Sequence, residues 1–149
     1  MALGSVNLNC IALIFVALLF STTCFSQVNQ SSTAGGKGPV LIKTISEADL
    51  LSKLNARDKF GLGFHLVDLR NESDFLKGFI PGAINIPSKK LTFIAEKVFS
   101  KADEVVFYSH SKTTHSAENA VTFMKNKGFM NCFVFAEGMD NWSGLIERS

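Results

Sequence analysis

Charged residues are absent before Lys37, although they make up 19% of the chain. This uncharged segment contains an uninterrupted apolar run over residues 11–20. The run is too short for a membrane span, which needs about 20 residues, but it is typical of the core of a secretory signal peptide. Because Cys24 and Ser26 fit a cleavage site before Gln27, we expect residues 1–26 to be removed and the protein to be exported to a periplasm or outside the cell. The alternatives are an uncleaved N-terminal anchor and lipidation at Cys24.

Cysteine is also scarce, and two of the three cysteines, Cys10 and Cys24, precede the expected cleavage site. Cys132 is then alone, and a single cysteine forms no internal disulfide. It lies in the apolar run 131–136, where a lone cysteine usually acts as a small core residue.

The chain also lacks a large excess of positive or negative charge. The net charge is +2, and lysine and arginine form no run, which argues against electrostatic binding of nucleic acid. A hydrophobic content of 46% is typical of a globular chain. Residues 27–38, rich in glycine, serine and glutamine, predict a flexible linker, and residues 39–149 are long enough to form one domain.

Short apolar runs alternate with helical patterns in this second part of the chain. The runs at 64–69, 83–86, 104–108 and 131–136 predict buried strands. Helical spacing or capping signals predict helices that begin near residues 47 and 72, cover 91–99 and 117–124, and close the chain at 139–146. Nearly continuous apolar strands separated by helices indicate an α/β fold with a parallel sheet covered on both faces.

Two segments resemble signatures of the rhodanese-like domain family, HLVDLRNESDFLKGFIPGAINIP from residue 65 and GFMNCFVFAEGMDNW from residue 128. The resemblance spans about residues 41–146 and implies a three-layer sandwich with a mostly parallel central sheet. In physical terms the matching residues suit turns and packing rather than chemistry. The family's structural motif falls on Asp68, Arg70, Pro81, Gly82, Gly138 and Trp142.

Active members of this family place a nucleophilic cysteine after the strand that corresponds to residues 104–108. The backbone N–H groups of the following loop and helix favour its thiolate, which carries sulfur as a persulfide. Here the position falls on Ser109 when the strand is aligned and on His110 when the helix is aligned, and a serine oxygen carries no persulfide. The resemblance therefore implies a binding or regulatory module without sulfurtransferase activity. The predicted anion- or ligand-binding loop comprises Ser109, His110, Ser111, Lys112, Thr113, Thr114, His115 and Ser116.

Two enzymatic alternatives stay open. One is a thiosulfate or persulfide sulfurtransferase, or sulfur carrier, that uses Cys132. The other is an enzyme like the rhodanese-fold phosphatases and arsenate reductases, because the loop from Ser109 to His115 is one residue longer than the usual sulfurtransferase loop.

No cofactor and no metal are expected, because His110 and His115 lack the spacing of a helical ligand pair and are interpreted as solvated loop residues. The expected partner is a protein or a small anion. Membrane contact is expected only through the N-terminal segment or lipidation at Cys24.

Overall fold

The computed structural model describes residues 40–61 and 63–148. The predicted signal peptide (1–26) and linker (27–38) lie outside these residues. Within the described ranges, no helix has the length and apolar character that crossing a membrane requires.

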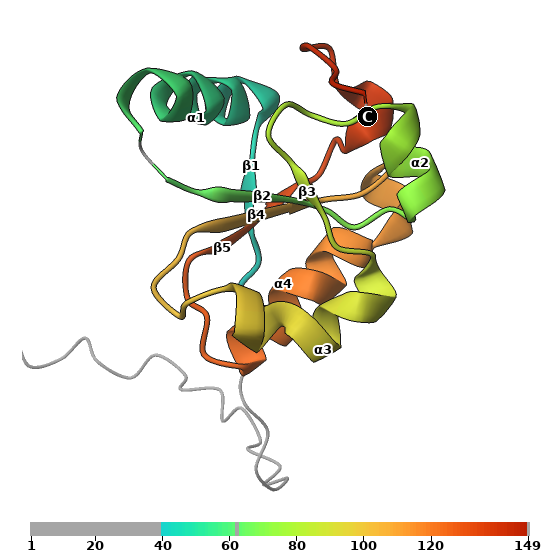
Figure 1. Cartoon of the computed structure of the whole chain (residues 1–149). Helices are drawn as coiled ribbons and strands as arrows, with labels where there is room; N and C mark the ends of the chain where they lie inside the picture. The colour runs from blue at the N-terminus through green and yellow to red at the C-terminus, as the bar shows by residue number, and fades with distance from the viewer. Residues whose placement is uncertain (1–39, 62, 149) are drawn as a thin grey trace, which may run out of the picture. The chain divides into compact units, whose positions relative to one another are not determined.

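The centre of the domain is a five-stranded sheet in the order β1-β5-β4-β2-β3 (Figure 1). All neighbouring strands are parallel, and the central strand β4 is buried along its whole length. A strand covered on both faces must be apolar throughout, which explains the continuous runs in the sequence. The strands are β1 (Lys43–Ile45), β2 (His65–Asp68), β3 (Ile84–Asn85), β4 (Val105–Tyr108) and β5 (Cys132–Phe135).

Helices cover both faces of this sheet, so the predicted three-layer α/β sandwich is confirmed (Figure 1). One hydrophobic cluster packs α3 (Ser88–Val98) and α4 (Ser116–Asn126) against one face. The second cluster packs α1 (Glu47–Phe60), together with Phe75 of α2 (Glu72–Lys77), against the other.

Local signals fix where the helices on the second face begin. The Ser46 hydroxyl accepts the N–H of Asp49 at 3.2 Å, and the Asp49 carboxylate accepts the N–H of Ser46 at 3.3 Å, which completes the predicted capping box. The side chain of Asn71 accepts the N–H of Asp74 at 2.8 Å and caps α2 in the same way.

The closing helix expected at 139–146 is wrong. Only a single 3-10 turn, η3 (Met139–Asn141), forms there, and an extended tail follows. The backbone of Trp142 is extended, with φ of −71° and ψ of 122°, so the turn ends there, and its indole N–H donates to the carbonyl of Leu145 at 2.8 Å. Glu147 then exchanges two backbone hydrogen bonds of 2.9 Å with Phe79. The sequence analysis also missed β1, whose three residues bury only Ile45 and so show no strand pattern.

Candidate functional site

The site begins where β2 and β4 end beside each other. Their register pairs Asp68 with Tyr108, so Arg70, Ser109 and His110 emerge from the same edge of the sheet. In open parallel sheets ligands bind beyond the carboxyl ends of the strands. This edge is therefore the place to look for function.

A buried ion pair forms the floor of the site. Asp68 is fully buried and Arg70 is 7% exposed, with Nη2 of Arg70 2.6 Å from Oδ2 of Asp68. Burial opposes the charge of Arg70, but the hydrogen bonds and the charge of Asp68 outweigh that cost and raise the pKa of the guanidinium. Arg70 also donates to the carbonyl of Gly78 at 2.8 Å. The pair thus ties the end of β2 to the end of α2.

Tyr108, the last residue of β4, is held beneath the loop. Burial, followed by the charge of Asp68, raises the pKa of its phenol well above the ordinary value, so the ring stays neutral. Its oxygen accepts the N–H of Ile80 at 3.3 Å. The sequence analysis did not single out Tyr108, because an aromatic residue in an apolar strand gives no separate signal.

The base of the loop is fixed from above by η3. The carbonyl oxygens of Ser109 and His110 accept the N–H groups of Met139 and Asp140, both at 2.9 Å. Gly138, with φ of 67°, lies so close that a Cβ there would overlap these carbonyl groups. Gly138 of the predicted motif therefore allows η3 to anchor the base of the loop, where Ser109 is buried.

The outer part of the loop is exposed and folds upon itself. Residues Lys112–Thr114 form the 3-10 turn η2, and the hydroxyl of Thr114 donates to the carbonyl of Ser111 at 2.8 Å. The hydroxyls of Ser111 and Thr113 lie 2.9 Å apart in a further hydrogen bond. His115, in the left-handed region with φ of 48°, leads into α4. Of the eight loop residues, Ser116 instead borders a hollow between α3 and α4.

The two loop histidines have different surroundings. His115 is exposed, as the sequence predicted. His110 is not simply solvated, because its Nε2 lies 3.3 Å from Oδ2 of Asp74 and its Nδ1 lies 3.7 Å from Oδ1 of Asp140. These carboxylates come from α2 and η3, which are distant in sequence, so spacing could not reveal the contact.

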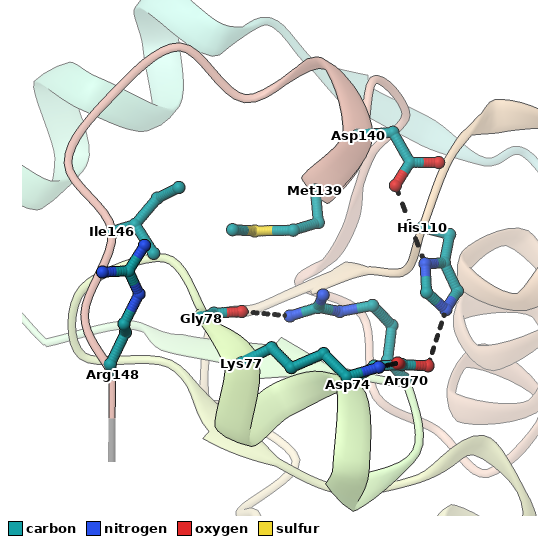
Figure 2. A pocket seen from close by; sticks show the side chains of 9 residues that line it. All are labelled: Arg70, Asp74, Lys77, Gly78, His110, Met139, Asp140, Ile146 and Arg148. Carbon is teal, nitrogen blue, oxygen red and sulfur yellow. Dashed lines mark hydrogen bonds and ion pairs between the residues drawn. The ribbon is translucent and has the colours of Figure 1, made fainter.

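A cavity of about 270 Å³ opens in front of His110. Figure 2 shows Arg148 and Ile146 on the wall opposite His110 and Asp140, with Met139 between them. Lys77 donates to Asp74 at 2.7 Å, and this hydrogen bond is the main reason why the pKa of Asp74 is lowered. The cavity is lined by Arg70, Asp74, Lys77, Gly78, His110, Met139, Asp140, Ile146 and Arg148.

The three cations of the cavity differ in their partners. Arg70 is paired with Asp68, and Lys77 is paired with Asp74. Arg148 forms no ion pair with any carboxylate among residues 40–61 and 63–148. Arg148 is thus the cation of the cavity lining that no carboxylate among the described residues neutralises.

Cys132 lies in β5, away from this cavity. Its side chain is fully buried, and burial raises the pKa of its thiol to about 11. The thiol therefore stays protonated at neutral pH, and a protonated, buried thiol is a poor nucleophile. In the described part of the chain, no three histidine, cysteine or carboxylate side chains gather closely enough to hold a metal ion.

Comparison with known proteins agrees with this architecture. The sequence model of the rhodanese-like domain matches residues 47–145. The uncharacterized protein YibN of Escherichia coli is 32% identical over 106 residues, which cover 69% of this chain and 68% of that protein. The putative sulfur carrier protein YrkF of Bacillus subtilis is 29% identical over 83 residues, 56% of this chain but only 43% of YrkF. The chain thus spans less than half the length of that relative.

Solved structures share the fold at lower identity. A rhodanese-like domain protein from Staphylococcus aureus has a TM-score of 0.59 at 21% identity, over 72% of this chain and 99% of that one. A rhodanese-related protein from Thermoplasma volcanium has a TM-score of 0.58 at 20% identity, over 70% and 97% of the two chains. With the strand order, the anchored loop and the family match over residues 47–145, the resemblance noted in the sequence is confirmed, and the chain belongs to the rhodanese-like domain family.

Proposed function

We propose that this protein is an exported rhodanese-like domain that binds a ligand with an anionic group and transfers no sulfur. The observation that carries the proposal is the chemistry at the end of β4, where Ser109 and His110 stand at the position of the family's cysteine. Sulfur transfer needs a thiolate that attacks the donor and then holds the sulfur as a persulfide. A hydroxyl and an imidazole supply neither property.

The cavity beside His110 supports binding of an anion. Arg148 offers a planar guanidinium that suits carboxylate, sulfate or phosphate groups. Arg70 and Lys77 also line the cavity, but each is already paired with a carboxylate. Asp74 and Asp140 lie on the side of His110, so the attraction is strongest toward Arg148. We therefore place the anionic group of the ligand against the wall formed by the C-terminal tail.

The name of YrkF as a putative sulfur carrier favours the first alternative, a carrier that uses Cys132. The full burial of Cys132 and the raised pKa of its thiol count against that role, because the thiol must reach the sulfur donor as a thiolate. For the phosphatase or arsenate reductase alternative, the longer loop is the only support. His115 is exposed there, and the loop again lacks the nucleophilic cysteine.

Intact-mass analysis of residues 27–149 after incubation with thiosulfate tests the absence of sulfur transfer. We expect an unchanged mass in this protein and in the Cys132→Ala variant. A reducible adduct of one sulfur atom that disappears in Cys132→Ala would instead establish a carrier cysteine. N-terminal sequencing of the protein from its native envelope tests the export proposal, with Gln27 as the expected first residue and a retained or lipidated N-terminus as the contrary result.

A further inference from the structure

The outward face of α3 carries lysines around an exposed aromatic ring. Lys89, Phe93 and Lys97 follow at intervals of four residues, so they lie along one face of the helix. The phenyl ring of Phe93 is 76% exposed, whereas Leu91 and Ala95 on the opposite face are buried. The ring of Phe93 is therefore open to contact with another surface, with a lysine on either side of it along the helix.

The charge of this strip is not neutralised within the domain. Among the described residues, no carboxylate pairs with Lys89, Lys90 or Lys97. Glu96 is the acidic residue of α3, and its carboxylate is turned toward Lys101 and Lys127, at 2.9 and 3.8 Å. The face therefore presents net positive charge around Phe93, which fits an anionic surface.

Apolar surface continues from the strip toward α2. A hollow of about 400 Å³ lies between α3 and α2. Leu76 and Ile94 give it apolar surface, and Lys90 and Glu72 add one charge of each sign. The neighbouring edge strand β3 has only two residues and is followed by Pro87, so it offers little backbone for an added peptide strand. An occupant that contacts side chains rather than a strand edge fits this face best.

We propose that this face of α3 binds the surface of an anionic phospholipid membrane. The lysine ammonium groups would contact lipid phosphates, and the ring of Phe93 would enter the boundary between headgroups and acyl chains. Helices that lie in this boundary combine basic residues with exposed aromatic or aliphatic side chains. The contact is separate from the ligand cavity and from the N-terminal segment, so it goes beyond the membrane contact expected from sequence.

Co-flotation of residues 27–149 with lipid vesicles tests the proposal, since these residues contain both hydrophobic clusters and all the described helices and strands. The vesicles are phosphatidylcholine alone, or phosphatidylcholine with about a third phosphatidylglycerol. We expect binding to the anionic vesicles that weakens with added salt, because it depends on charge. The triple variant Lys89→Ala, Phe93→Ser, Lys97→Ala should bind at least about 25-fold more weakly, since each lysine near such a surface contributes about fivefold.

A matched control variant removes two lysine ammonium groups and one phenyl ring from a different part of the surface. Phe60 is 67% exposed beside Lys59, so the variant Lys43→Ala, Lys59→Ala, Phe60→Ser loses two charges and one phenyl ring away from α3. The control should keep most of the binding. Equal losses in the two variants, equal binding to neutral vesicles, or no vesicle binding by the unmodified protein would each overturn the proposal.

Discussion

Gly138 lies against the backbone of His110 so closely that a single added carbon would overlap the carbonyl oxygen. This contact, together with the bonds from Met139 and Asp140 to the loop carbonyls, holds the loop in place without any side chain. The glycine is thus required both by space and by its φ of 67°.

Replacement of Gly138 by alanine should therefore cost about 3 kcal/mol of unfolding free energy, from backbone strain and overlap together. Gly61 is a matched control, because its φ is 66° but nothing lies within 4 Å of its added Cβ. Gly61→Ala should cost only about 1 kcal/mol. Urea unfolding of the two variants measures the difference, and equal losses would show that the close approach to His110 has no energetic importance.

The buried pair of Asp68 and Arg70 should be costly to break from one side. Arg70→Leu leaves the carboxylate of Asp68, which is 0% exposed, without its cation. Removal of one partner of a buried pair typically costs about 3–5 kcal/mol. The control is Lys77→Ala, which breaks an ion pair whose lysine is 74% exposed and should leave the unfolding free energy almost unchanged. A small loss in Arg70→Leu would mean that water or the chain compensates the charge.

The sequence predicted the fold well because the fold depends on repeated local patterns. Four of the strands and the helices from α1 to α4 each have an apolar run, a capping residue or a helical period of their own. The site was harder to predict, because its contacts join residues far apart in the chain. His110 meets Asp74 and Asp140, and Arg148 reaches the cavity only because the tail pairs with Phe79 instead of forming the expected helix.

The raised pKa of Cys132 predicts a specific loss of stability in alkali. In the unfolded chain the thiol loses its proton near its ordinary pKa of about 8.5–9, but in the folded domain it keeps the proton up to about pH 11. Between these values the unfolded state binds fewer protons, so stability falls as pH rises, by about 1.4 kcal/mol per pH unit at most. Below pH 8 the thiol is protonated in both states, and its contribution does not change with pH.

The Cys132→Ala variant isolates this effect from the titration of lysines and tyrosine. Its unfolding free energy should differ from that of the unmodified protein by a constant amount below pH 8. Between pH 9 and 11 the difference should change by about 2 kcal/mol in favour of the variant. If the difference in unfolding free energy between the two proteins stays constant up to pH 11, the thiol titrates normally and is accessible in the folded domain. That result would support the alternative of a sulfur carrier that uses Cys132.

The position at which the anion binds distinguishes the cavity in front of His110 from the exposed loop. The sequence places the ligand at residues 109–116, with Lys112 as the cation, whereas the geometry favours Arg148 in the cavity in front of His110. Binding of sulfate, phosphate and thiosulfate to residues 27–149 can be measured from NMR chemical shifts during a titration. Arg148→Ala should weaken this binding by about 10- to 100-fold, as expected for the loss of charge-assisted hydrogen bonds. Lys112→Ala should bind like the unmodified protein. The reverse pattern would move the site to the outer loop, where η2 leaves the ammonium group in solvent. If both variants bind the anion as tightly as the unmodified protein, neither the cavity nor the outer loop is the binding site, because each variant removes the cation on which one of these sites depends.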